Sequence, residues 1–224
     1  MLTDLFIFRS TPLLPSYLHI AERTCTKAFY KLFVELIEAL PHSPELLANL
    51  PQKKSFSLNK TKYDLPMFGL GQLFQKEEAA GKIRTFAIVD CWTQTILSPL
   101  HRYLSDLLKR MPNDGTASHS EAFDRVRIRS AHFGCAYGYD LSAATDRLPI
   151  SLQVKLIQAL FGVDFGNHWR DLLVGRPYYL LEDSRVPRIF RYAVGQPMGA
   201  RSSFTMLSLT HHMLVQFAAS QLRG

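Results

Sequence analysis

The chain has 224 residues, of which 47% are hydrophobic and 20% are charged. That apolar content excludes disorder along the whole length and is enough for one domain or two small ones. The formal net charge of +7 favours a polyanionic partner such as nucleic acid, or else a basic surface kept for solubility.

The three cysteines, Cys25, Cys91 and Cys135, stand far apart and form no CxxC pair. An odd count without metal-ligand spacing predicts buried thiols in a reducing compartment, not a disulfide frame or a zinc site. No apolar run reaches the ~18 uncharged residues of a membrane span, so none is expected. Asp4 precedes the short apolar run at the N-terminus, and no targeting peptide can be read there.

In the first half, residues 27–40 place their apolar side chains on one helical stripe, which Pro41 ends. Residues 41–72 carry several lysines among prolines and glycines and are interpreted as a basic loop region. A short strand at 84–89 precedes an amphipathic helix at about 93–111, and a turn follows at 112–115.

In the second half, Phe133, Cys135, Tyr137 and Tyr139 alternate with small residues, which predicts a strand ending at Asp140. Helices are expected at about 151–161 and 168–174. The remaining predicted elements are a β-hairpin formed by Tyr178–Leu181 and Arg188–Tyr192 around Glu182-Asp183-Ser184, a tight loop at 195–199, and a long helix from Ser202 to Gln221.

The sharpest chemical signal is the segment Asp140-Leu-Ser-Ala-Ala-Thr-Asp146. Nucleotidyl transfer by two divalent ions needs carboxylates held rigidly, and a strand end is such a place. Asp146 would lie just past the turn, within reach of a ribose hydroxyl. The alternative is structural, with Asp140 ending a strand and Asp146 capping the helix that Pro149 begins. Taken alone, two aspartates in a turn favour that alternative.

The segment Gly195-Gln-Pro-Met-Gly199-Ala-Arg-Ser202-Ser203 leads directly into the last long helix. Glycines let a backbone approach a substrate closely, and small hydroxyls at a helix start can reach a sugar or a base. The loop is a weak signal by itself. Its position some fifty residues after a strand-end aspartate makes the combination strong.

A third signal is the basic pair Lys82 and Arg84 in the strand that runs from Gly81 toward Asp90. Side chains two residues apart in an extended strand point to the same side. They could bind a triphosphate, with arginine as a bidentate donor. A solvated strand edge carrying protective charges is the alternative for this segment alone.

These segments resemble the polymerases of mitoviruses, capsidless RNA viruses that replicate in mitochondria, and related fragments in plant mitochondrial and nuclear genomes. The resemblance runs from about Leu70 to Ala219. It covers Gly81–Gln94, Pro99-Leu-His101, Asp114-Gly-Thr116, Asp140–Pro149, and Arg191–Gln216 with Thr210-His-His212.

The resemblance implies a role for each matching position. Lys82 and Arg84 match the motif that steadies the incoming triphosphate, and Asp140 matches the catalytic metal ligand. Asp146 matches the residue that recognises the ribose 2′-hydroxyl, helped by either Ser202 or Ser203. Gly195 and Gly199 match a mobile loop at the template–substrate pair. Arg201 and Phe204 stand where an apolar residue and a tryptophan are expected.

The largest departure is that the sequence contains no Asp-Asp pair. The resembling polymerases carry a Gly-Asp-Asp hairpin after the helix that here ends near Gln221. Glu182-Asp183 comes before the glycine loop and is interpreted as an ordinary turn. One aspartate cannot offset the repulsion of two dications, so no complete Mg²⁺ or Mn²⁺ pair is expected. An unpaired Asp140 strand and an uncovered apolar face on the last helix are also expected.

The predicted fold is α+β, a partial right-hand polymerase with fingers and the first half of the palm but without the palm hairpin and thumb. The expected segments are an N-terminal helical and loop region at 1–65, a fingers segment at 66–132 and an incomplete palm at 133–224.

The predicted function is that of a truncated RNA-directed RNA polymerase homologue, inactive alone and mitochondrial by resemblance, with an RNA template and ribonucleoside triphosphates as partners. The alternatives are a non-catalytic RNA-binding module and a split enzyme completed by a second chain. A reverse-transcriptase or maturase fragment is more distant, because an aspartate at 146 would accept a hydrogen bond from a 2′-hydroxyl.

Overall fold

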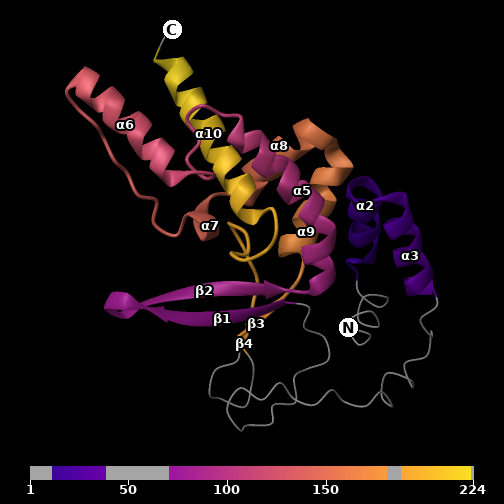
Figure 1. Ribbon diagram of the computed structural model, residues 1–224. Helices are drawn as coiled ribbons and strands as arrows, with labels where there is room; N and C mark the ends of the chain where they lie inside the picture. The colour runs from indigo at the N-terminus through magenta and orange to yellow at the C-terminus, as the bar shows by residue number, and fades with distance from the viewer. Residues whose placement is uncertain (1–11, 39–70, 181–187, 223–224) are drawn as a thin grey trace.

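A computed structural model describes residues 12–38, 71–180 and 188–222, and every structural statement below concerns these residues (Figure 1). The predicted basic loop up to residue 70, most of the region 1–65 and the Glu182-Asp183 turn lie outside them. The elements in chain order are α2 (Leu14–Thr24), α3 (Lys27–Glu38), β1 (Gly71–Glu78), the 3-10 turn η1 (Ala79–Gly81), β2 (Lys82–Val89), α5 (Cys91–Lys109), α6 (His119–Phe133), α7 (Ala144–Arg147), α8 (Ile150–Phe161), α9 (Val163–Val174), β3 (Tyr178–Leu180), β4 (Arg188–Phe190) and α10 (Ser203–Gln221).

The four strands form one mixed sheet in the order β2-β1-β3-β4. β1 and β2 pair antiparallel in a long hairpin, with Gly71 opposite Val89 and Glu78 opposite Lys82. β3 pairs parallel to β1 and antiparallel to β4, so the predicted hairpin in the second half is confirmed. Sheet and helices together confirm the predicted α+β class.

The core lies where α2, α5, α8 and α9 pack together beside the sheet (Figure 1). Its centre is a set of side chains with no exposed surface, each contributing about 1.5–3 kcal/mol through burial. Among them are Tyr17, Ile96, Leu97, Leu104, Ile157 and Trp169. The amphipathic stripe of α5 supplies several of these residues, which explains why apolar spacing predicted that helix correctly.

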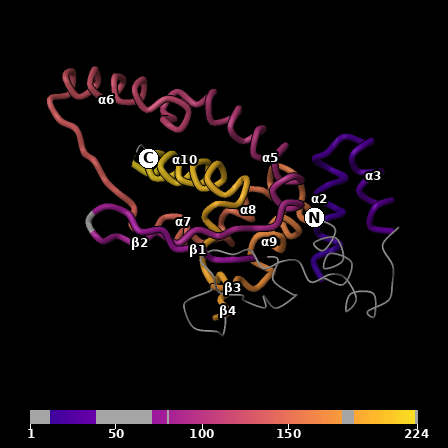
Figure 2. Tube along the Cα trace, turned by 60° about the horizontal axis from the view of Figure 1, so that its bottom comes forward, coloured from indigo at the N-terminus to yellow at the C-terminus, as the bar shows by residue number. Residues whose placement is uncertain are grey.

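An arm consisting of α6 and residues 134–143 stands away from this core (Figures 1 and 2). No residue of α6 is buried. Both ends of the helix are capped: the Ser118 hydroxyl accepts from the Glu121 N–H, and Gly134 ends the helix at φ 73°. Apolar periodicity did not reveal α6, whereas the Ser-x-x-Glu capping pattern could have.

The predicted strand from Phe133 to Asp140 is wrong. Phe133 is the last residue of α6, and residues 135–140 have no regular secondary structure. A strand exists only through hydrogen bonds to a neighbour, and among the described residues no strand lies beside this segment. Its alternating aromatics therefore face water, with Tyr137 81% and Tyr139 91% exposed.

The other predicted helices are present with shifted ends, α9 starting five residues earlier than expected. α2 and β1 were not predicted. The expectation of an uncovered apolar face on the last helix is confirmed, since Met213, Val215 and Phe217 are about half exposed or more. Among the described helices, none has the length and apolar character that crossing a bilayer requires.

Candidate functional site

A cavity of about 480 Å³ lies at the junction of β2, α5, α7 and the loop that leads into α10. Its volume is within the range of small-molecule sites. Each of the three segments with a chemical signal contributes to it: Arg84 from β2, Thr145 from the turn before Asp146, and Gly199 with Ser203 from the glycine loop. The other lining residues are Gln94, His101, Met198, Ala200, Arg201, Phe204 and Leu207.

The glycine loop reaches the cavity because it is held against α7. The Gln196 N–H donates to the Thr145 carbonyl oxygen at 3.0 Å, and the Ile150 N–H donates to the Val194 carbonyl oxygen at 2.8 Å. A Cβ on Gly195 would lie 2.2 Å from that same Thr145 oxygen, which no side chain tolerates. Glycine at 195 is therefore required by the close approach of two backbones.

The other end of the loop is held against β2 and α5. The Ala87 N–H donates to the Met198 carbonyl oxygen at 2.7 Å. Gly199 has φ 116°, and a Cβ there would lie 2.7 Å from the Ala87 carbonyl oxygen. The Gln94 side chain donates to the Gly199 carbonyl oxygen at 3.0 Å and accepts from the Arg201 N–H at 2.8 Å. Segments more than one hundred residues apart in sequence thus form one wall.

Two non-glycine residues adopt the left-handed backbone conformation, and they are the only ones among the described residues. Ala143, at φ 52°, precedes α7, and Ser202, at φ 67°, precedes α10. Such conformations cost about 1–3 kcal/mol each and cluster at functional sites. Ser202 directly precedes the cavity-lining Ser203, and Ala143 lies two residues before the cavity-lining Thr145.

The two serines at the start of α10 have different surroundings. Ser202 is fully buried, and its hydroxyl accepts from the Trp169 indole N–H at 2.9 Å. Ser203 lines the cavity, and its buried hydroxyl oxygen has no hydrogen-bond partner among the described residues. Since a buried unsatisfied hydroxyl is costly, Ser203 is the serine available to a ligand.

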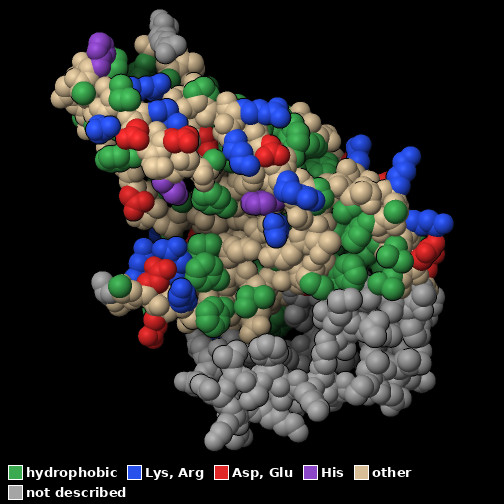
Figure 3. Space-filling model, in the orientation of Figure 1, with side chains coloured by type: hydrophobic (Ala, Val, Ile, Leu, Met, Phe, Trp, Pro, Cys, Tyr) green, Lys and Arg blue, Asp and Glu red, His purple; other side chains and the backbone are tan. Residues whose placement is uncertain are grey.

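The charged groups are distributed unevenly around the cavity. Arg84 lines it and pairs with Glu78 at 3.1 Å, whereas Lys82 is exposed and does not line it. Burial, and then the Arg201 charge, lower the pKa of His101. Figure 3 shows Lys and Arg side chains gathered with acidic ones near the hairpin tip.

The two aspartates of the sharpest signal are not equivalent. Partial exclusion of water raises the pKa of the Asp146 carboxyl. Burial, together with the Asp146 charge, raises the pKa of Tyr192 to about 12, so Asp146 lies near that phenol. Asp146 is in α7 and does not cap α8, whose N-cap is Pro149. Asp140 is exposed and is not part of the cavity lining.

A two-metal centre does not fit these residues. Within the described ranges, no three His, Cys, Asp or Glu side chains lie close enough to hold an ion together. Two dications a few ångströms apart need several anionic ligands. Asp140 supplies one carboxylate at most, so no step of a reaction is derived through a metal here.

Comparison with known proteins accounts for the three segments together. The family model for the mitovirus RNA-dependent RNA polymerase matches residues 1–223. The chain belongs to this family.

Relatives of this polymerase family cover parts of the chain. An RNA-directed RNA polymerase of Cryphonectria parasitica mitovirus 1 (strain American chestnut tree/New Jersey/NB631) is 44% identical over 152 residues, which is 67% of this chain and 18% of that protein. Two uncharacterized mitochondrial proteins of Arabidopsis thaliana are 30% and 31% identical, over 51% and 50% of this chain and 55% and 45% of their own lengths. The chain thus spans less than two thirds of each relative. No solved structure matches it.

Asp114 and His212 both lie in segments that resemble the polymerases, and they form a contact that the sequence did not predict. His212 Nε2 lies 2.8 Å from the buried Asp114 carboxylate, and the Thr116 N–H and hydroxyl both donate to that carboxylate. Arg125 donates to the Asp114 carbonyl oxygen at 2.7 Å. The cluster joins α6 and α10 to the loop that follows α5.

A buried network on the other side fixes the β2–α5 junction. Arg176 donates to the Asp90 carboxylate at 2.5 Å, to the Tyr17 hydroxyl at 2.7 Å and to the Thr93 hydroxyl at 2.8 Å. Asp90 also caps α5 by accepting from the Thr93 N–H. Sequence analysis missed this network because its members lie on segments up to 159 residues apart.

Proposed function

We propose that this chain is the nucleotide-binding part of a mitovirus-type RNA-directed RNA polymerase, containing fingers and the first half of the palm. The family activity is template-directed joining of ribonucleoside triphosphates, and the expected compartment is the mitochondrion. The observation that carries the proposal is that three sequence segments with separate nucleotide-related signals line one cavity. Convergence of this kind is not required by packing alone.

In this proposal two residues that line the cavity, Arg84 and Ser203, act together with two residues beside it, Lys82 and Asp146. The Arg84 guanidinium binds the triphosphate, and Lys82 adds positive charge from the same strand. The Ser203 hydroxyl and the Asp146 carboxylate meet the ribose, where Asp146 accepts a hydrogen bond from the 2′-hydroxyl. The pKa of Asp146, raised by exclusion of water, makes that acceptor dependent on pH. Arg201 and Phe204 border the site in place of the expected apolar residue and tryptophan.

We also propose that the chain alone does not join nucleotides. Asp140 is the family's metal-ligand position, and Mg²⁺ or Mn²⁺ is the expected ion. The carboxylates that complete a pair would come from a second polypeptide segment, as in a split enzyme. The long exposed stretch around Asp140, without a strand beside it among the described residues, supports such a partner.

Nucleotide binding by the purified chain tests the first proposal. We expect ATP to bind more tightly than 2′-deoxy-ATP, and Arg84→Gln to weaken ATP binding roughly tenfold, the loss of one charged hydrogen bond. Arg127→Gln on the exposed face of α6 removes the same charge and serves as the matched control. Calorimetric titrations that show equal ATP affinity for both variants would refute the assignment of Arg84.

The two serines provide a second test of the same site. Ser203→Ala is expected to reduce the preference for ATP over 2′-deoxy-ATP, because Ser203 lines the cavity and its hydroxyl has no hydrogen-bond partner among the described residues. Ser202→Ala is expected to leave that preference unchanged and to lower stability, because it loses the Trp169 hydrogen bond. The reverse pattern would exchange the two assignments.

Primer extension tests the claim that the chain is inactive alone. The chain is supplied with RNA template, primer, four ribonucleoside triphosphates and Mg²⁺ or Mn²⁺, and no extension is expected. Extension that disappears in Asp140→Ala would overturn the claim. A non-catalytic RNA-binding module is the second candidate, favoured by the net charge of +7. It predicts salt-dependent RNA binding without nucleotide selectivity.

A further inference from the structure

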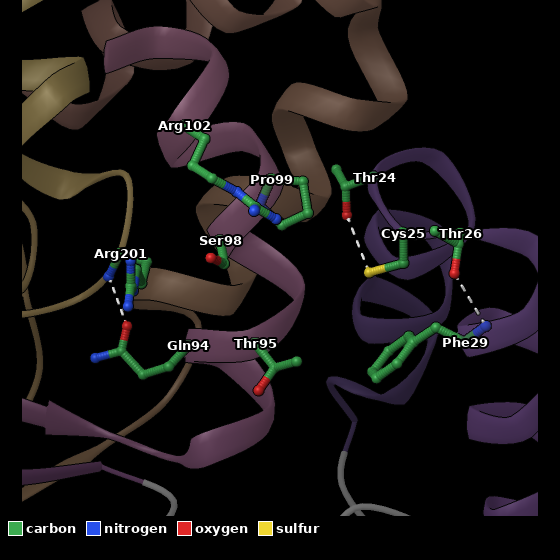
Figure 4. A pocket seen from close by; sticks show the side chains of 10 residues that line it. All are labelled: Thr24, Cys25, Thr26, Phe29, Gln94, Thr95, Ser98, Pro99, Arg102 and Arg201. Carbon is green, nitrogen blue, oxygen red and sulfur yellow. Dashed lines mark hydrogen bonds between the residues drawn. The ribbon is translucent and has the colours of Figure 1, made fainter. Parts of the chain in front are cut away.

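A second cavity, of about 490 Å³, lies between the N-terminal helices and α5 (Figure 4). Residues of α5 and Arg201 form one wall, and the turn between α2 and α3 forms the opposite wall. The sequence did not predict this cavity. It shares two lining residues, Gln94 and Arg201, with the first cavity. Its other lining residues are Thr24, Cys25, Thr26, Phe29, Thr95, Ser98, Pro99 and Arg102.

The charge of this cavity selects an anionic ligand. Arg102 and Arg201 are both exposed cations on its lining, and no acidic residue belongs to that lining. Among the described residues, the Arg102 guanidinium makes no hydrogen bond or ion pair, whereas Lys109 on the same helix pairs with Asp106 at 3.3 Å. Two unopposed guanidinium groups suit the phosphates of a nucleic-acid backbone.

An aromatic face and uncommitted polar groups add the features of a nucleotide. Phe29 stacks on Phe33 at 6.1 Å between ring centroids, and Phe33 in turn contacts Trp92 at 5.2 Å. Phe29 therefore packs on an aromatic cluster and lines the cavity, where a base can stack on it. Pro99 has no N–H, so the Thr95 carbonyl oxygen at the cavity lacks its usual helical donor and can accept from a base or a ribose hydroxyl.

The connection to the first cavity indicates a polymer. Gln94 is fixed by hydrogen bonds to the backbone of Gly199 and Arg201, and it lines both spaces. A ligand with repeating phosphates can contact Arg102 in the second cavity and Arg201 where the two cavities meet. The Cys25 thiol is not a reactive group here, because burial raises its pKa.

We infer that this cavity binds one nucleotide unit of single-stranded RNA, with its phosphate on Arg102 and Arg201 and its base on Phe29. The inference deepens the proposed function and rests on it for the direction in which the strand continues. It assigns a ligand contact to α2 and α3, the helices for which the sequence predicted no role.

The salt dependence of RNA binding tests this inference. The full chain is titrated with a fluorescein-labelled 12-nucleotide oligouridylate at several salt concentrations, and binding is followed by anisotropy. Each phosphate contact on a single strand contributes about 0.7 to the slope of log K against log salt. Arg102→Gln is expected to lower that slope by about this amount and to weaken binding several-fold. Arg110→Gln, an exposed arginine at the end of the same helix, is the matched control and should change neither quantity.

Phe29→Leu keeps an apolar side chain against Phe33 while removing the stacking face. It is expected to weaken oligouridylate binding several-fold with the salt slope unchanged, and the unfolding midpoint is recorded alongside to show that the variant is folded. Equal binding by Arg102→Gln and Arg110→Gln, or by Phe29→Leu and the unaltered chain, would overturn the inference.

ATP titration of the same variants separates this inference from the proposed function. Arg102→Gln should bind ATP as the unaltered chain does, because Arg102 does not line the first cavity. Loss of ATP selectivity with Arg102-dependent RNA binding retained would refute the nucleotide site and leave the RNA site standing. ATP selectivity retained, with RNA binding that does not depend on Arg102, would refute the RNA site alone.

Discussion

Residues 134–141 and residues 144–150 are neighbours in sequence, but only the second segment is hydrogen-bonded to the glycine loop. The first segment belongs to the arm, and all of its side chains are exposed. The second is held by backbone hydrogen bonds to Val194 and Gln196 and borders the first cavity through Thr145. Asp140 and Asp146 are both exposed, but Asp146 lies in α7 near Tyr192, whereas Asp140 lies in the arm. The comparison teaches that one half of a sequence motif can be hydrogen-bonded to a neighbouring loop while the other half is left exposed.

The largest expected difference concerns buried and exposed ion pairs. Arg176→Met leaves the buried Asp90 carboxylate without its cation, and we expect the free energy of unfolding to fall by about 3–5 kcal/mol. Arg127→Met removes an exposed pair with Asp124 in the arm, where such pairs contribute at most about 1 kcal/mol. Urea unfolding measures both. Similar losses of unfolding free energy in the two variants would contradict the distinction between the packed core and the arm.

The next comparison is between Gly195, which packs against residues 145 and 146, and Gly138 in the arm. Gly195→Ala places a Cβ 2.2 Å from the Thr145 carbonyl oxygen, so the loop must move, at a cost of about 1–3 kcal/mol. ATP binding should be lost with it. Gly138→Ala in the arm meets nothing within 4 Å and should leave stability and ATP binding unchanged. Unfolding curves and ATP titrations that rank the two variants the other way would show that the loop is not packed as described.

The Asp114 cluster predicts a pH dependence that an arm aspartate should not share. Burial alone would raise the pKa of Asp114, but hydrogen bonds from Thr116 and His212 outweigh it and lower the pKa. A lowered folded-state pKa gives stability that is present above the unfolded value of about 3.9 and is lost as the pH falls below it.

We therefore expect the free energy of unfolding to fall less steeply below about pH 4 in Asp114→Asn than in the unaltered chain. At neutral pH the variant should be less stable by about 1 kcal/mol, the contribution of a hydrogen bond. Asp124→Asn in the arm is the control and should keep the original slope. Parallel curves for all three proteins would refute the role of Asp114.

The smallest expected effect on stability lies on the exposed half of α10. Phe217 is 65% exposed, so Phe217→Ser should change the free energy of unfolding by no more than about 0.5 kcal/mol. It should reduce self-association in light scattering, because it removes part of an apolar patch. Met206→Ala, in the buried half of the same helix, should cost about 2 kcal/mol or more. Unchanged self-association of the Phe217→Ser variant would show that the apolar patch does not drive self-association.

Much of the fold follows from local pattern, and what was missed has identifiable causes. The stripe of α5 and the alternation around Tyr178 predicted elements that exist, since burial of one face enforces the period. α6 was missed because its order depends on capping, and the Phe133–Asp140 strand was predicted wrongly because alternation specifies a strand only when a neighbour pairs with it. For the site, sequence supplied Arg84, Gly199 and Ser203, but not the choice between the two serines.

The sequence by itself determined the polymerase family, the α+β class and the residue types that a nucleotide site needs. Those properties are written in short segments, where spacing and side-chain chemistry suffice. Tertiary structure alone decided that Arg84, Thr145 and Ser203 share a cavity and that Ser202 turns to Trp169. It also placed Arg102 opposite Phe29 across a second cavity. These outcomes depend on which backbones approach one another, and contacts between residues far apart in sequence leave no local pattern to predict them from.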